Sequence, residues 1–122
     1  MTSGAETTRA VALIEQIKSW HHARNLIAGS DDKTQFAKLI QEAGELSDNI
    51  CKGKDIRDDI GDMMVVLINI AERNNLSITE CLEVAYDDIK DRKGKMVDGV
   101  FVKEADLEKP EYKNTKFGQT KY

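Results

Sequence analysis

The chain has 122 residues, a length that fits one domain with one hydrophobic core. Hydrophobic residues make up 40% of it and charged residues 33%, with one proline and 6% aromatics, which favours an all-α globular protein. The net charge of -4 argues against general nucleic-acid binding, which depends on many lysine and arginine contacts with phosphates. We expect a single domain over residues 1–122, with a core at about residues 4–106 and a tail at 107–122 that is flexible or docked on a partner.

The sequence also lacks the features of an exported or membrane-spanning protein. Two cysteines, Cys51 and Cys81, are too few for a disulfide framework, and we expect both to be core thiols. No basic segment followed by an apolar one opens the chain, and the apolar run at residues 63–70 is too short to cross a bilayer. These observations predict a cytoplasmic protein with no membrane partner.

The first two predicted helices are separated by the segment IAGSDDK. Ser3 and Glu6 match a capping box, and apolar residues recur at helical spacing as far as Trp20, so a first helix is predicted at about residues 4–27. Asp32 is expected to cap the second helix, which ends near residues 52–54. The apolar stripe of that helix consists of Phe36, Leu39, Ile40, Ala43, Leu46 and Ile50.

A third helix is predicted from about Ile56 to Arg73, and over residues 63–70 it is apolar on nearly every side. Such a helix needs partners on more than one side, and a chain with only four helices does not supply them. We therefore expect a homodimer or homotetramer that forms through this helix. The main apolar face of the helix consists of Ile56, Ile60, Met63, Met64, Leu67 and Ala71.

The remaining elements are a fourth helix and a short hairpin. An asparagine pair at residues 74–75 suits a helix end, because asparagine tolerates the left-handed conformation. Ser77 is expected to cap the fourth helix, and Gly94 to stop it. Asp98-Gly99, between two short β-prone runs, predicts a tight turn. The predicted fold is a four-helix bundle-like single domain, all-α, with a short C-terminal hairpin and tail.

Two pairs of acids, each with a spacing of three residues, lie on the second and third predicted helices. Helical geometry places Glu42 and Glu45 roughly 90° and 150° to one side of their apolar stripe. Asp59 and Asp62 lie roughly 80° and 140° to the same side of theirs. If the two helices pack antiparallel through the stripes, all four carboxylates line one edge of the pair. Carboxylates this close must take up a proton or bind a cation, and Mg²⁺ or Mn²⁺ suits them.

A simpler alternative is that each acid pair is a solvated flank of its helix. Two pairs on matching flanks, beside an unusually apolar segment, favour a shared site over that alternative. Asn69 lies two turns beyond Asp62 on the same flank, inside an otherwise apolar run. Its amide is either a satisfied core group or a contact to a ligand.

The same stretch resembles a known family. KLIQEAGELSDNI followed by DDIGDMMVVLINIAE is similar to the all-α nucleoside triphosphate pyrophosphohydrolases of the MazG-like group, in the compact single-domain form common in phages and some bacteria. The family signature is E-x-x-E, a spacer, and an acid-x-x-D. In this chain the signature is Glu42, Glu45, thirteen intervening residues, Asp59 and Asp62. A weaker resemblance covers about residues 20–106.

The chain departs from the family pattern at two positions. Gln41 stands where many relatives have a further glutamate, so no carboxylate is available there as a ligand or base. Asp59 stands where glutamate is more usual, and its shorter side chain would shift a bound ion by about one methylene.

The resemblance implies Mg²⁺-dependent hydrolysis of (deoxy)nucleoside triphosphates between the α and β phosphates, with Mn²⁺ as a possible substitute. The products are a nucleoside monophosphate and pyrophosphate, and the role is control of a nucleotide pool in the cytosol of a bacterium or a phage-infected host. A triphosphate brings about four negative charges to the acids, so divalent ions must lie between the phosphates and the carboxylates. The residues that would hold the metal are Glu42, Glu45, Asp59 and Asp62. Either Glu42 or Glu45 would accept the proton of the attacking water. The alternative is a noncatalytic, dimeric helical adaptor that binds a protein through residues 63–70 or through the tail.

Cationic and aromatic side chains near the motif are the candidates for binding the substrate. The leaving pyrophosphate needs positive charge, although cations at a helix C-terminus are common whatever the function. The phosphate-binding candidates are Lys38, Lys90, Arg92 and Lys93. The nucleoside is expected to contact the first helix, the loop after it or the third helix. Those candidates are Trp20, which could equally belong to the core, Arg24, Asn25, Gln35 and Asn69.

Overall fold

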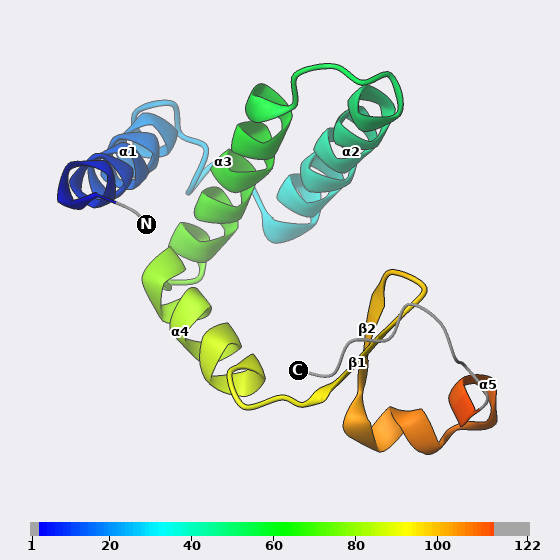
Figure 1. The fold of residues 1–122 in the computed structure, drawn as a ribbon. Helices are drawn as coiled ribbons and strands as arrows, with labels where there is room; N and C mark the ends of the chain where they lie inside the picture. Colours follow the sequence, from blue (N-terminus) through cyan, green and yellow to red (C-terminus); the bar gives the residue numbers. More distant parts are fainter. Residues whose placement is uncertain (1–2, 114–122) are drawn as a thin grey trace. The chain divides into compact units, whose positions relative to one another are not determined.

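The computed structural model describes residues 3–113, and the chain divides into two compact units with a boundary between Cys81 and Leu82. The mainly helical character predicted from the sequence is confirmed (Figure 1), whereas the single domain over residues 1–122 stays a prediction. The first unit contains α1 (Gly4–Ala23), α2 (Asp32–Cys51) and α3 (Arg57–Arg73). The fourth helix, α4 (Ile78–Ile89), crosses the boundary, and β1 (Gly94–Val97), β2 (Val100–Lys103), the 3-10 helix η1 (Glu104–Glu108) and α5 (Pro110–Lys113) follow.

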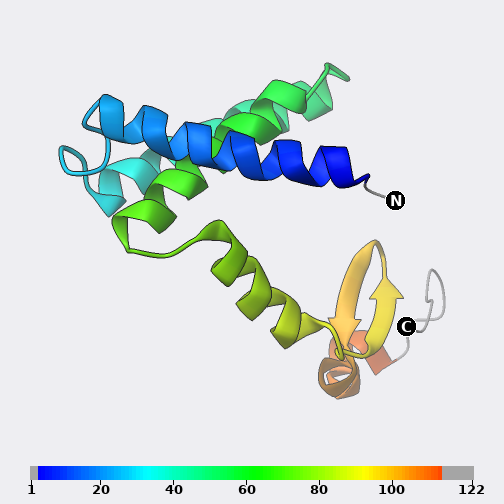
Figure 2. The ribbon, with the colours of Figure 1, turned by 90° about the vertical axis from the view of Figure 1, so that its left-hand side faces the viewer.

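In the first unit, α3 lies between α1 and α2. α2 and α3 form an antiparallel pair, and α1 packs along another side of α3 (Figures 1 and 2). The short connection between α2 and α3 includes Gly53 at φ 66, a left-handed conformation that glycine adopts without a steric penalty. Because the connection is short, residues early in α3 lie beside residues late in α2.

The cap of α2 differs from the prediction by one residue. Asp31, not Asp32, is the N-cap, and its Oδ1 accepts a hydrogen bond from the Thr34 backbone N–H at 2.7 Å. Asp32 instead accepts hydrogen bonds from Arg73 Nε at 3.1 Å and from the Asn74 side-chain amide. The side chain of Asp32 is bonded to the end of α3 and does not cap α2. Helical periodicity does not reveal this contact.

The other helix ends agree with the sequence at some positions and differ at others; α4, for example, ends at Ile89, and Gly94, predicted to stop it, begins β1. Ser3 accepts from the Glu6 N–H at 3.0 Å, as the capping box predicts, and Ser77 does the same for α4. α1 ends at Ala23 and not near residue 27, because Asn25 at φ 58 turns the chain out of the helix. Asn75 at φ 57 supplies the predicted left-handed end of α3.

The buried centre of the first unit contains a polar group as well as apolar ones. Asn69 is completely buried; its Nδ2 donates to the Leu26 carbonyl at 3.0 Å and lies 3.2 Å from His21 Nδ1. His21 Nε2 lies 3.0 Å from the Val65 carbonyl. These contacts tie α3 to α1 and to the loop after it. Asn69 Oδ1 is buried with no hydrogen-bond partner among the described residues, and the nucleoside contact predicted for Asn69 stays a prediction.

The contact between α2 and α3 is rotated relative to the predicted apolar stripes. The less exposed residues of α2 recur at Leu39, Glu42, Leu46 and Asn49, so this side faces α3. Several members of the two stripes stay exposed instead. They are Phe36, Ile40 and Ile50 on α2 and Ile60, Met64 and Leu67 on α3, and we call them the apolar face. Viewed along each helix from its N-terminus, the exposed residues lie on the same side of the residues that contact the other helix. Because the two helices are antiparallel, these two sides meet on one face of the helix pair.

The second unit is built on the predicted hairpin. β1 and β2 pair antiparallel from Gly94 opposite Lys103 to Val97 opposite Val100. The turn residues Asp98-Gly99 have φ values of 50 and 82, the left-handed pair that a two-residue turn requires. Gly94 is needed at its position, because a Cβ there would collide with the Val102 carbonyl oxygen.

Three further predictions meet different outcomes. Cys51 and Cys81 are both free and exposed, so the prediction of core thiols is wrong. Within residues 3–113, no helix combines the length and the apolar character needed to cross a membrane. Of the predicted tail, η1 and α5 cover the part up to residue 113, and residues 114–122 lie outside the described residues.

Candidate metal centre

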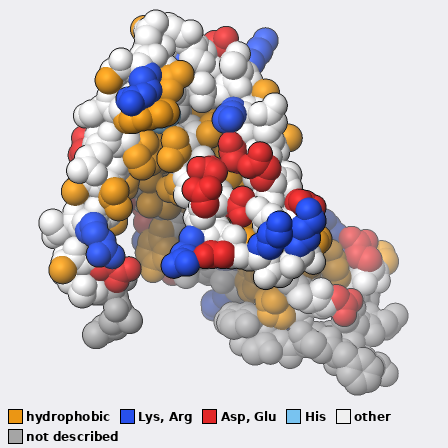
Figure 3. Space-filling model, turned by 90° about the horizontal axis from the view of Figure 1, so that it is seen from above, with side chains coloured by type: hydrophobic (Ala, Val, Ile, Leu, Met, Phe, Trp, Pro, Cys, Tyr) orange, Lys and Arg blue, Asp and Glu red, His pale blue; other side chains and the backbone are white. Residues whose placement is uncertain are grey.

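Three of the four predicted acids come together on the first unit. Glu42, Glu45 and Asp62 each offer one carboxylate oxygen, and these oxygens all lie within 4.8 Å of one another. Two of the acids are one turn apart on α2, and the antiparallel packing of α3 brings the third beside them. On the face drawn in Figure 3, Asp and Glu side chains gather beside a band of hydrophobic side chains. We call Glu42, Glu45 and Asp62 the acid cluster.

Glu42 is the buried member of the acid cluster. The residue is 7% exposed, and its Oε1 lies 3.4 Å from Lys38 Nζ, one helical turn earlier. Its Oε2 is buried and has no hydrogen-bond partner among the described residues. Leaving a buried polar atom unpaired costs about 1–3 kcal/mol, and more for a charged group. A hard divalent cation, which prefers carboxylate oxygens, fits both this unpaired atom and the donor set around it.

The carboxylates of the acid cluster repel one another. The negative charge of Glu42 raises the pKa of the Glu45 carboxyl above its ordinary value, and the closeness of the two carboxyls and desolvation add to the effect. Desolvation raises the pKa of Asp62, and the charges of Asp58 and Glu42 act in the same direction. Lys38 opposes both shifts without cancelling them. The cluster therefore favours a bound proton or cation over three free carboxylates.

The fourth predicted acid, Asp59, has a different partner. Asp59 is 6% exposed, and its two oxygens accept hydrogen bonds from Asn49 Nδ2 at 3.1 and 3.0 Å. Asp59 precedes Asp62 by one helical turn on α3, and its charge contributes to the raised pKa values of Glu45 and Asp62. The sequence interpretation missed Asn49. Its spacing from Glu42 and Glu45, seven and four residues, places it on the same side of α2 and could have revealed it.

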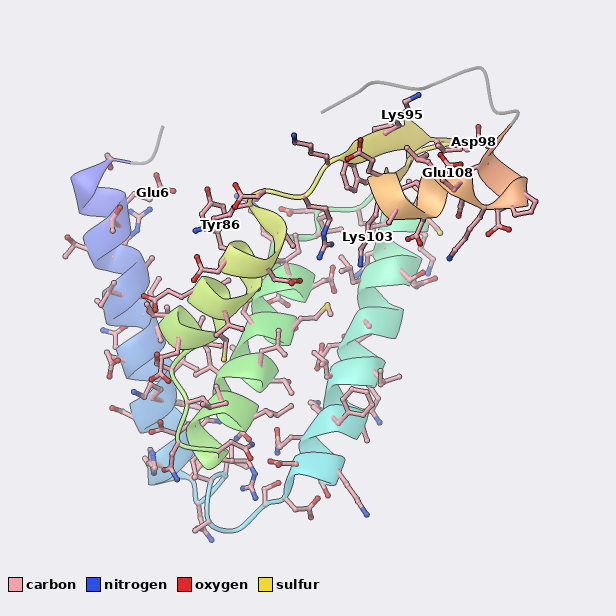
Figure 4. All side chains as sticks on the ribbon, turned by 90° about the horizontal axis from the view of Figure 1, so that it is seen from below. Glu6, Tyr86, Lys95, Asp98, Lys103 and Glu108 are labelled. Atoms are coloured by element: carbon pink, nitrogen blue, oxygen red, sulfur yellow. The ribbon has the colours of Figure 1, made fainter. Side chains whose placement is uncertain are left out.

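The predicted phosphate-binding residues divide between the two units. Lys38 lies at the acid cluster, paired with Glu42. In the second unit, Lys90 pairs with Asp87 at 3.2 Å and Arg92 with Asp88 at 2.9 Å, both along the helix end. The following hairpin carries further lysines, Lys95 on β1 and Lys103 at the end of β2 (Figure 4). The phosphate-binding roles of Lys90, Arg92 and Lys93 stay predictions.

A groove between α1 and α3 adjoins the acid cluster. Its volume is about 410 Å³, and it shares Asp62 with the cluster. Trp20 lines it and is 44% exposed, with the Arg24 guanidinium 4.5 Å from its ring centroid. The groove is lined by Leu13, Gln16, Ile17, Trp20, Asp62 and Val65.

The other predicted nucleoside contacts lie outside this lining. Gln35 Nε2 donates to Ser30 Oγ at 3.0 Å, within the region that joins α1 to α2. Asn25 adopts the left-handed backbone conformation that turns the chain at the end of α1. Of the five predicted residues, the structure thus brings Trp20 to the groove and Arg24 against Trp20.

Comparisons with known proteins leave the family open. No family model matches the chain, and no solved structure matches it. An "Uncharacterized 18.2 kDa protein in rep-hol intergenic region" of Haemophilus phage HP1 (strain HP1c1) is 41% identical over 66 residues. The matched stretch is 52% of this chain and 40% of the phage protein, so the chain spans about two fifths of that relative. Its description gives a genome position and no activity.

The repulsion within the acid cluster predicts that Glu45→Gln stabilises the metal-free protein at pH 7. The folded-state pKa of Glu45 lies above its ordinary value of 4.5, so ionisation of Glu45 opposes folding. The destabilisation is absent below the ordinary value and develops as the pH rises through the raised pKa. Thermal unfolding in EDTA should give a higher midpoint for Glu45→Gln than for the wild type at pH 7, with the two midpoints converging near pH 4.

A suitable control is Glu6→Gln, which removes an exposed acid from the first turn of α1. It should not stabilise the protein at pH 7, since a negative charge near a helix N-terminus is favourable. A gain in Glu45→Gln that is equal at pH 4 and pH 7 would contradict the electrostatic explanation.

Proposed function

We propose that this protein is a Mg²⁺-dependent nucleoside triphosphate pyrophosphohydrolase. It hydrolyses (deoxy)nucleoside triphosphates between the α and β phosphates, yields the monophosphate and pyrophosphate, and thereby controls a nucleotide pool in the cytosol. The resemblance of residues 38–72 to the MazG-like signature motivates this reaction. The similarity to a phage-encoded protein agrees with a phage setting but says nothing about the reaction.

One observation carries the proposal: the unpaired, buried carboxylate oxygen of Glu42 beside two further carboxylates. An acid pair on a solvated flank would have its oxygens in water, where repulsion is weak. Here the Glu42 carboxylate is buried, its neighbours Glu45 and Asp62 have raised pKa values, and Lys38 offsets only part of the negative charge. This arrangement is costly for stability and is of the kind found at sites that bind a cation or act on protons.

The protein side chains divide the chemical tasks. A bound Mg²⁺ would supply charge neutralisation of the phosphates and a water of lowered pKa. Glu42, buried and unpaired at Oε2, suits a ligand role, as does Asp62. Glu45 is exposed and its pKa is raised, so it suits the general base that takes the proton of the attacking water. Lys38 lies beside these acids and can contact a phosphate once its carboxylate partner is engaged elsewhere.

The groove between α1 and α3 is the proposed nucleoside site. It opens beside Asp62, so a nucleotide with its phosphates at the acid cluster has its base or sugar within reach of the groove. The half-exposed Trp20 ring offers a stacking surface to any base, and base–aromatic stacking contributes about 1–3 kcal/mol. The groove is largely apolar, which favours the planar base over the charged phosphates.

The apolar face of α2 and α3 supports the proposal of a homodimer or homotetramer. Ile40 is 56% exposed and Ile60 is 50% exposed, although both belong to apolar stripes on long helices. A second α2–α3 pair, laid against the first, would complete a four-helix bundle and remove these side chains from water. The apolar face lies on one side of the α2–α3 contact and Glu45 lies on the other side. A partner bound to the apolar face therefore leaves the acid cluster accessible.

The same apolar face is the observation that favours the alternative, a noncatalytic helical adaptor. An adaptor needs an exposed apolar surface, but it does not need a buried carboxylate without a partner. Mg²⁺ with nucleotide should raise the unfolding midpoint of an enzyme, because ligands that bind only the folded state stabilise it. A midpoint unchanged by Mg²⁺ and nucleotide favours the adaptor.

The central test is release of pyrophosphate from a panel of canonical and damaged (d)NTPs with Mg²⁺ or Mn²⁺. Glu45→Gln and Asp62→Asn should each lower the rate by about 100-fold or more, since they remove a base and a ligand. EDTA should abolish the activity. Circular dichroism spectra must match the wild type, and Glu6→Gln serves as the active control. Activity that persists in EDTA or in Glu45→Gln contradicts the proposal, and release of orthophosphate instead indicates a different cleavage position.

Binding to the groove can be followed through Trp20, the one tryptophan of the chain. A non-hydrolysable nucleoside triphosphate with Mg²⁺ should change its fluorescence in a saturable way, because the base lies against the ring. Inorganic pyrophosphate with Mg²⁺ should bind the acid cluster and leave the fluorescence unchanged. An equal response to both ligands would show that the groove does not hold the nucleoside.

The oligomer can be tested at the apolar face. Sedimentation should show a dimer or tetramer for the wild type and a monomer for Ile40→Glu or Met64→Glu, because a charge buried in the interface is strongly unfavourable. Val11→Glu is the matched control, since Val11 is 58% exposed on α1 and lies outside the face. A monomeric wild type would remove this part of the proposal.

A further inference from the structure

Asn49 is the polar side chain that connects the fourth signature acid to α2. Its Nδ2 lies 3.1 and 3.0 Å from the two oxygens of Asp59, and Asp59 is 6% exposed. Asn49 itself is partly buried. The bond therefore joins α2 to the first turn of α3 at the place where the two helices meet, near the acid cluster.

The geometry of this bond leaves Asp59 free to bind something else. An ionised carboxylate has about four lone-pair sites, and the amide of Asn49 engages each oxygen only once. Asp59 precedes Asp62 by one helical turn, while Asn49 follows Glu45 by one turn. The amide consequently fixes the direction of the Asp59 carboxylate, one helical turn from Asp62, and leaves it with further acceptor capacity.

Resting on the proposed function, we infer that Asn49 is a positioning residue for the cation site: it fixes Asp59 at the contact between α2 and α3 so that Asp59 joins the acid cluster as a fourth carboxylate when a divalent cation binds. Without the amide, the short Asp59 side chain would be free to choose other rotamers. The site would then pay the entropy of ordering this ligand each time it binds an ion.

Mg²⁺ titration by calorimetry, without nucleotide, tests this role separately from catalysis. Asn49→Ala should weaken Mg²⁺ binding by about tenfold or more, the usual effect of losing a group that orients a metal ligand. Asn74→Ala is the matched control, because Asn74 donates to both oxygens of Asp32 at the other end of α3. Its Mg²⁺ affinity should equal that of the wild type.

A swapped pair separates positioning from simple stabilisation. The double variant Asn49→Asp with Asp59→Asn keeps an amide–carboxylate pair between the helices but moves the carboxylate to α2. If the pair only stabilises the fold, the swap restores stability and binds Mg²⁺ like the wild type. A required Asp59 carboxylate predicts restored stability with Mg²⁺ affinity still lowered about tenfold or more. If Asn49→Ala fails to fold, Asn49→Gln tests the positioning instead, because it keeps Asp59 and an amide donor but moves the donor by one methylene, and it should also weaken Mg²⁺ binding.

The outcomes distinguish this inference from the proposed function. If the wild type binds Mg²⁺ and Asn49→Ala binds it equally well or more tightly, Asn49 is not a positioning residue and the proposed function stands. If the wild type binds Mg²⁺ and the double variant binds it with the same affinity, the conclusion is the same. If the wild type itself does not bind Mg²⁺, the cation site and the role of Asn49 both fall.

Discussion

The burial of carboxylates between α2 and α3 is the constraint on which the candidate site depends. Glu42 and Asp59 are 7% and 6% exposed, and each comes from a different helix. Burying a charge is costly unless it is paired, and the two acids meet this condition to different degrees. Asp59 has both oxygens hydrogen-bonded to Asn49, whereas Glu42 has a lysine at one oxygen and, within residues 3–113, no hydrogen-bond partner at the other.

This difference has a consequence for the stability of the helix pair. A helix pair selected for stability alone would place alanine or leucine where Glu42 and Asp59 lie, because an ion pair replaced by well-packed apolar groups is often neutral or stabilising. Instead, these acids lie beside other carboxylates, and a bound cation would relieve the repulsion among them. A ligand that brings positive charge would then stabilise the fold.

The rotation that buries the acids also explains the exposed apolar face. Each of the two helices has a broad apolar stripe beside an acidic flank, and only part of this surface can face the other helix. Because Glu42 and Asp59 turn inward, Phe36 and Ile40 on α2 and Ile60 on α3 turn outward. The acid cluster and the proposed oligomer contact are therefore two results of one helix orientation, on opposite sides of the same helix pair.

The sequence determined the features that depend on neighbours along the chain. Capping by Ser3 and Ser77, the left-handed Asn75 and the Asp98-Gly99 turn all follow from local hydrogen bonds and backbone sterics. Spacing also fixed which acids share a side of each helix. Only the tertiary structure decided how far each helix rotates about its own axis, since that depends on packing between segments far apart in the sequence, with α3 in contact with both α1 and α2. That rotation buried Glu42, gave Asp59 the partner Asn49, and made Asn69 a core residue bonded to Leu26.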